Sequence, residues 1–121
     1  MKIRNILVTG ALAIVSAATS TAYAHAKLES TEPKAHSVVE QSPKQIHLKF
    51  NETLELAFSK VKLLDQQNLV IEPLKVDLDK ANPSAMIATL PRLQTGAYRV
   101  QWTTMTRDGH KVKGEFAFNV K

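Results

Sequence analysis

Apolar and polar residues alternate over the C-terminal part of the chain, and this pattern limits the fold most strongly. A period of two residues is typical of strands that bury one face. The alternation is interrupted by the polar segment 107–110, which contains the turn signal Asp108-Gly109. It predicts two antiparallel strands joined by a polar turn. The residues expected to face inward are Tyr98, Val100, Trp102, Phe116, Phe118 and Val120.

Short segments of the same kind fill the region before these strands, separated by Pro, Asn, Asp or Ser. About seven short strands, with turn signals near every tenth residue, predict an antiparallel β-sandwich or β-barrel. Pro73 indicates an edge strand or a bulge. Residues 51–56 are expected to form one helical turn at most. The further strands are expected at 27–31, 45–51, 58–64, 69–71, 76–78 and 86–90, and the core aromatic residues are expected to be Phe50, Phe58, Tyr98, Trp102, Phe116 and Phe118.

The first 24 residues have the three parts of a secretory signal peptide. Lys2 and Arg4 supply the positive region, residues 6–18 are almost wholly apolar, and Ala22-Tyr23-Ala24 is a small-x-small cleavage signal. The apolar run is shorter than the roughly 20 residues that span a bilayer. We therefore expect residues 1–24 to be a cleaved signal peptide and residues 25–121 to be one exported domain beginning at His25.

Cysteine and charge exclude several kinds of site. The chain contains no cysteine, which rules out disulfides and thiolate metal ligands. Its formal charge is +5, and removal of residues 1–24 leaves 14 Lys and Arg against 11 Asp and Glu. This mild, scattered excess is not typical of a nucleic-acid-binding surface. The chain also lacks a Gly-x-Ser-x-Gly nucleophile motif and a glycine-rich phosphate loop.

Cleavage after Ala24 would create a potential metal chelate. The new α-amino group and the imidazole Nδ1 of His25 can bind one ion together, and such nitrogen donors favour Cu(II). Asp108 and His110 are candidate partners, because residues two apart in an extended chain share a face. An Asp-Gly-His segment is also a common kind of turn. The residues alone therefore leave two interpretations open, a metal site and coincidence.

Six stretches of the chain together form a recognisable set. They are His25-Ala-Lys-Leu, Thr31-Glu-Pro-Lys-Ala, Ile46-His-Leu-Lys-Phe-Asn-Glu, Gly96-Ala-Tyr-Arg-Val-Gln-Trp, Asp108-Gly-His and Gly114-Glu-Phe-Ala-Phe-Asn-Val. With these stretches the chain resembles the CopC family of periplasmic copper-binding proteins. The resemblance implies a Greek-key, cupredoxin-like β-barrel of seven strands. It also implies a Cu(II) site formed by the amine and ring of the N-terminal His25, with Asp108 and His110, and a CopD-type copper transporter in the inner membrane as partner.

The family also has a methionine-rich Cu(I) site, which this sequence does not reproduce. Residues 62–76 contain neither Met nor His, and the methionines that follow residue 24, Met86 and Met105, are far apart. Because thioether ligands select Cu(I), we expect a protein with the Cu(II) site only. His36 and His47 are expected to be exposed rather than ligands.

Two other functions remain open at the level of the sequence. One is a copper-dependent redox enzyme, because an N-terminal His with a second His resembles the histidine brace of lytic polysaccharide monooxygenases. The other is an immunoglobulin-like interaction domain without a metal, in which residues 108–110 are only a turn. A copper carrier without enzymatic activity is our first hypothesis.

Overall fold

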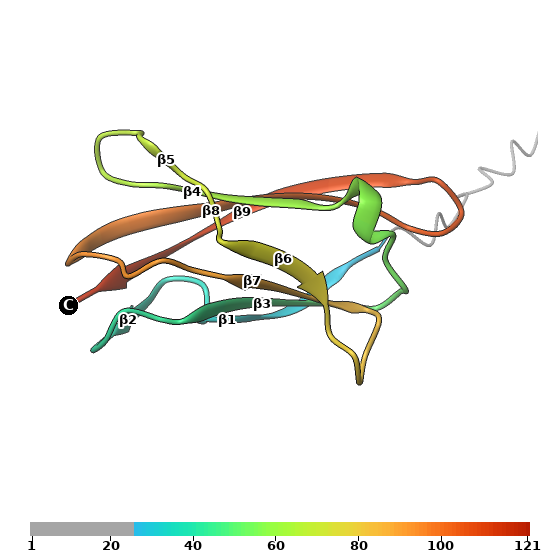
Figure 1. Cartoon of the computed structure of the whole chain (residues 1–121), viewed down its shortest axis with the longest axis horizontal. Helices are drawn as coiled ribbons and strands as arrows, with labels where there is room; N and C mark the ends of the chain where they lie inside the picture. The colour runs from blue at the N-terminus through green and yellow to red at the C-terminus, as the bar shows by residue number, and fades with distance from the viewer. Residues whose placement is uncertain (1–25) are drawn as a thin grey trace, which may run out of the picture.

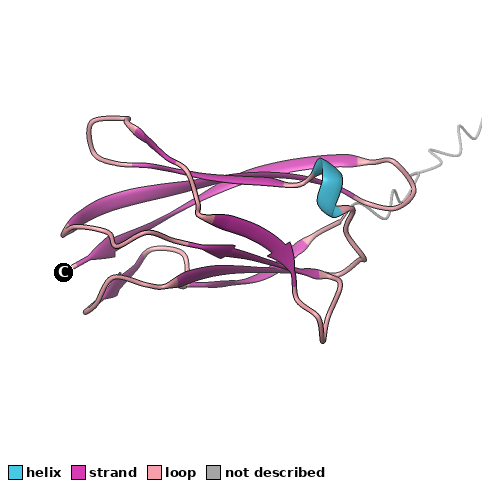
Figure 2. Cartoon of the chain, in the orientation of Figure 1, coloured by secondary structure: helices cyan, strands magenta, loops and turns pink. Residues whose placement is uncertain are grey.

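The structure is a sandwich of two β-sheets (Figures 1 and 2). It is a computed structural model that describes residues 26–121, so the expected signal peptide and His25 lie outside the described residues. Its elements are β1 (Leu28–Glu32), β2 (Ser37–Val39), β3 (Gln45–Phe50), the 3-10 helix η1 (Leu56–Phe58), β4 (Lys60–Leu64), β5 (Val70–Ile71), β6 (Lys75–Leu78), β7 (Ala85–Thr89), β8 (Gly96–Met105) and β9 (Lys111–Val120).

One sheet has the strand order β1-β3-β7-β6 and the other has the order β2-β9-β8-β4-β5. Neighbouring strands are antiparallel except for β2, which runs parallel to β9. The predicted all-β sandwich is therefore confirmed. The two C-terminal strands form the longest pair, and their register runs from Gly96 opposite Val120 to Met105 opposite Lys111.

Aromatic side chains from both sheets meet in the core. Phe50 of β3 contacts Trp102 of β8 edge-on, with ring centroids 5.0 Å apart, and Tyr98 stacks on Phe118 at 5.7 Å. Each of these four side chains is at least nine-tenths buried, as is Phe116. Burial of apolar surface stabilises the fold by about 25 cal/mol per Å², so these residues contribute strongly. Five of the six predicted core aromatic residues are confirmed.

Phe58 is the exception, because its side chain is 58% exposed. It ends η1 instead of beginning β4, and the expected single helical turn thus forms at Leu56–Phe58, later than residues 51–56. The buried Ser59 turns the chain at this point: its hydroxyl donates to the carbonyl of Glu55 at 2.7 Å and lies 2.7 Å from Thr104 Oγ1. Within residues 26–121, no helix is long and apolar enough to cross a membrane.

The ends of the two sheets show what sequence patterns can and cannot detect. Pro73 lies between β5 and β6, which are the edge strands of different sheets, so the predicted edge location is confirmed. β2 was not predicted. It contains three residues whose pairing with β9 joins segments about 80 positions apart, from Ser37 with Phe118 to Val39 with Val120. A three-residue strand is too short to show a period of two.

Gly114 allows the Trp102 indole to pack across the β8–β9 pair. The two residues lie opposite each other in the register. A Cβ atom at Gly114 would lie 2.4 Å from Trp102 Cζ2, well inside contact distance. The indole therefore occupies space that any other residue at position 114 would fill.

Candidate metal centre

The turn between β8 and β9 holds Asp108 and His110 in a fixed geometry. The Gly109 amide donates to the carbonyl of Thr106 at 3.0 Å, and the Thr106 amide donates to the carbonyl of His110 at 3.0 Å. Gly109 has a φ of 89°, a left-handed conformation that favours glycine. This combination is a type I turn followed by a glycine bulge, a common way to close a hairpin.

Asp108 and His110 are in direct contact. Asp108 Oδ2 lies 2.9 Å from His110 Nδ1, and both side chains are partly exposed. The facing predicted from the spacing of two residues is therefore present, although the residues belong to a turn. Two adjacent ligands with metal bonds of about 2.1 Å at right angles lie about 3 Å apart. A metal ion bound to both atoms would fit this separation, and it would replace the proton of their hydrogen bond.

The side chain of Thr106 holds the Asp108 carboxylate in place. Its hydroxyl hydrogen-bonds to Asp108 Oδ1, and the residue is only 2% exposed. This hydrogen bond is the largest cause that lowers the pKa of Asp108, followed among the lowering causes by the hydrogen bond and charge of His110. The carboxylate is therefore ionised at neutral pH, as a metal ligand must be.

The described N-terminus lies at the same end of the sandwich as this turn. In Figure 1, the beginning of β1, η1 and the β8–β9 turn occupy the same end of the molecule. Ala26 is 2% exposed and belongs to the core. The Lys27 amide donates to Asn51 Oδ1 at 2.6 Å, and the Asn51 amide donates to the carbonyl of Lys27 at 3.1 Å.

Segment 51–55 connects this anchor to the turn. Leu54 forms an isolated β-bridge with Thr106, and the Glu55 amide donates to the carbonyl of Met105 at 2.8 Å. A continuous connection of hydrogen bonds and covalent chain thus runs from the start of the described chain to the Asp108–His110 pair. It passes through Lys27, Asn51, Leu54 and Thr106. His25 directly precedes Ala26 in the sequence and lies outside the described residues.

Other potential ligands lie elsewhere in the described part of the chain. His47 Nε2 is 3.0 Å from Gln45 Oε1 on β3, and the His36 amide donates to the carbonyl of Ala117 at 2.7 Å. Met86 is fully buried in the core. Within residues 26–121, no three His, Asp or Glu side chains are grouped so that they could hold a metal ion. The Asp108–His110 pair supplies two donors.

Sequence reasoning did not identify Thr106 or Asn51. A Thr two residues before the Asp of a turn is a local signal for a side-chain hydrogen bond, and it was available in the sequence. The role of Asn51 had no such signal, because its partner Lys27 is 24 residues away.

Comparison with known proteins identifies the family. Residues 28–121 match the family model for the CopC domain. The chain is 36% identical over 114 residues to Protein YobA of Escherichia coli K12, an alignment that covers 92% of each. It is 34% identical to Copper resistance protein C of Xanthomonas campestris pv. juglandis, covering 98% of this chain and 97% of that protein.

The fold agrees with this relationship. The crystal structure of CopC from Methylosinus trichosporium OB3b superposes with a TM-score of 0.74 at 28% identity, covering 80% of this chain and 94% of that one. Sequence and fold thus lead to the same assignment. The chain belongs to the CopC family of copper-handling proteins.

Proposed function

We propose that this protein is a periplasmic carrier that binds and sequesters Cu(II) in copper homeostasis or resistance. The amine and imidazole of His25 hold the ion after removal of residues 1–24, together with the Asp108 carboxylate and the His110 imidazole. The observation that carries this proposal is the anchoring of the start of the described chain near the Asp108–His110 pair, through the bonds of Lys27 to Asn51 and the bridge of Leu54 to Thr106.

Chain geometry supports the participation of His25. Consecutive Cα atoms are about 3.8 Å apart, so the anchoring of Ala26 and Lys27 limits the distance between residue 25 and the turn. The two nitrogens of His25 form a chelate within one residue, and the fold contributes the other two donors. Imidazole, amine and carboxylate donors suit Cu(II), and the isolated methionines offer no thioether cluster for Cu(I).

The family and the ligand set support a binding role in preference to catalysis. A relative that aligns with nearly the whole chain is named Copper resistance protein C. Asp108 beside His110 occupies a coordination position that a histidine-brace oxygenase keeps open for oxygen. Sustained peroxide formation and polysaccharide cleavage by the copper-loaded protein with ascorbate would favour an enzyme.

The partner that we propose for delivery is a CopD-type transporter in the inner membrane.

The test compares two forms of the protein, one that begins at His25 and one with a single additional N-terminal residue. The extension removes the free amine of His25, so we expect a changed Cu(II) spectrum and a large loss of affinity. His110→Ala should also weaken binding by more than the roughly 10–100-fold typical of removing a group that only supports a ligand.

His47→Ala is the matched control, because it removes an imidazole from the opposite sheet and should leave affinity unchanged. Equal copper affinity for the native and extended N-termini would show that the ligand assignment is wrong.

A further inference from the structure

The outer face of β4, β8 and β9 concentrates positive charge. Along these strands, residues that point into the core alternate with exposed or half-buried ones. The outward positions include five cations and one acid, whereas the rest of residues 26–121 contains nine cations and ten acids. The excess that looked scattered in the sequence is therefore gathered on one side of the sandwich. The charged residues of this cationic face are Lys60, Lys62, Arg99, Lys111, Lys113 and Glu115.

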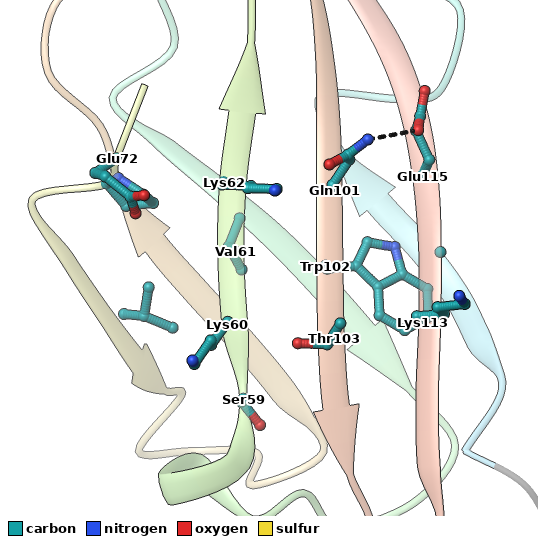
Figure 3. Close-up of a pocket in the computed structure, with 13 residues that line it drawn as sticks. Ser59, Lys60, Val61, Lys62, Glu72, Gln101, Trp102, Thr103, Lys113 and Glu115 are labelled. Carbon is teal, nitrogen blue, oxygen red and sulfur yellow. Dashed lines mark hydrogen bonds between the residues drawn. The ribbon is translucent and has the colours of Figure 1, made fainter. Parts of the chain in front are cut away.

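The register arranges these cations in rows across the sheet. Lys60 is opposite Thr103, and Thr103 is opposite Lys113. Figure 3 shows these three side chains, which come from three adjacent strands. In the row nearest the β8–β9 turn, Lys111 is opposite Met105 and directly follows His110. The cationic face therefore continues to the candidate metal centre.

Most of this positive charge is not neutralised by the described residues. Glu115 already accepts from Gln101 Nε2 at 3.0 Å and is 3.4 Å from Arg99 Nη1 (Figure 3 shows the Gln101 bond). Lys60, Lys62 and Lys113 make no ion pair within 4.0 Å among residues 26–121. Three ammonium groups on one surface repel one another, and an anionic partner relieves that repulsion.

The shape of this face favours a polypeptide segment over a flat membrane. A trough of about 770 Å³ crosses it, and its charged lining consists of three lysines and two acids, so it keeps a positive excess. The lining includes Lys60, Lys62, Lys113, Glu72, Glu115 and the polar Gln101 and Thr103. A polypeptide can enter the trough, accept hydrogen bonds from Gln101 and Thr103 and pair carboxylates with the lysines. The exposed Phe58, two residues before Lys60, offers an apolar contact beside the trough.

We propose that the cationic face is the docking surface for an acidic segment of the protein that exchanges copper with the Asp108–His110 centre. This inference rests on the proposed copper-binding function. A partner bound here would lie next to the turn that carries His110, because Lys111 belongs to the same face. Charge complementarity mainly accelerates encounter, so the effect on copper exchange should be greatest at low salt.

The first test measures the binding of a fluorescent peptide that alternates Glu and Leu to the exported protein, with and without copper. The triple variant Lys60→Gln, Lys62→Gln, Lys113→Gln should bind at least about tenfold more weakly. The matched control Lys34→Gln, Lys44→Gln, Lys49→Gln removes the same charge elsewhere and should bind like the unaltered protein. Thermal unfolding of both variants checks that each is folded.

Equal losses in the two triple variants would overturn the proposal, because net charge alone would then explain binding. Absence of peptide binding to the unaltered protein would also overturn it. So would binding of phosphatidylglycerol vesicles through these lysines without binding of the peptide, since that result assigns the face to a membrane.

The second test measures the rate of copper transfer to a chelating peptide with either an acidic or a basic extension. Transfer to the acidic form should be at least about tenfold faster, and the cationic-face triple variant should lose this advantage. Equal rates for the two extensions would overturn a role in exchange. Copper affinity is measured on the same samples, so failure of the metal site is distinguished from failure of docking. If the protein does not bind copper but still binds the acidic peptide through these lysines, the proposed function alone is refuted.

Discussion

Thr106 is the residue whose role in the candidate metal centre can be tested most directly. Its buried hydroxyl fixes one oxygen of Asp108, while the other oxygen faces His110. Thr106→Val keeps the shape of the side chain and removes the hydrogen bond. We expect Cu(II) affinity to fall by about 10–100-fold, the usual cost of losing a group that orients a ligand. Competitive copper titration measures this change.

Thr106→Ser is the matched control, because serine retains the hydroxyl and should restore most of the affinity. Thermal unfolding of the metal-free variants separates a general loss of stability from a local effect on Asp108. If valine and serine variants bind copper equally well, the hydroxyl does not position the carboxylate.

Individual residues were predictable where the signal was local. The facing of Asp108 and His110 was predicted from their spacing, because residues two apart in an extended chain share a face. Phe58 was placed in the core because aromatic residues are usually buried. Its exposure depends on the hydrogen bonds of Ser59 to Glu55 and to Thr104, and Thr104 belongs to a strand 45 residues away.

At the scale of elements, the β8–β9 pair depends on the absence of a side chain at Gly114. Gly114→Ala would place a Cβ atom 2.4 Å from Trp102 Cζ2, so the indole or the strand must move. Overpacking of this kind typically costs about 1–3 kcal/mol. We expect the free energy of unfolding in urea to fall by that amount, with a change in tryptophan fluorescence.

Lys113→Ala is the control on the same strand. Its side chain is on the outer face, so its effect should stay within about 0.5 kcal/mol. An unchanged stability of Gly114→Ala would mean that Trp102 does not require the space above Gly114.

The strands themselves were largely predictable, since alternation over five or more residues determines which face is buried. The hairpin formed by β8 and β9 followed from two alternating segments around Asp108-Gly109. β2 was missed because its three residues gain their place only from the backbone of β9. The pairing of distant segments is a tertiary property that local patterns do not carry.

For the whole molecule, copper binding should stabilise the fold through Asp108 and His110 rather than through His25. In the proposed site, the amine and ring of His25 belong to one residue, so the unfolded chain could still form that chelate. Only the additional affinity of the folded state raises stability. If that additional affinity is about a thousandfold, Cu(II) should add about 4.1 kcal/mol. For a domain of this size, the melting temperature should rise by roughly 15–30 °C.

Calorimetry with and without Cu(II) tests this expectation. His110→Ala should still bind copper through His25, but with a much smaller rise in melting temperature. A rise as large as in the unaltered protein would show that His110 is not a ligand in the folded state.

The sequence by itself determined the elements whose causes are local: the alternating strands, the hairpin turn and the paired side chains of Asp108 and His110. Only the tertiary structure decided which distant parts meet. Segment 51–55 brings Ala26 to the same end of the sandwich as Thr106, and the register of β4, β8 and β9 gathers lysines from three strands on one face. Register and sheet order depend on the packing of the whole core, and no short stretch of sequence specifies them.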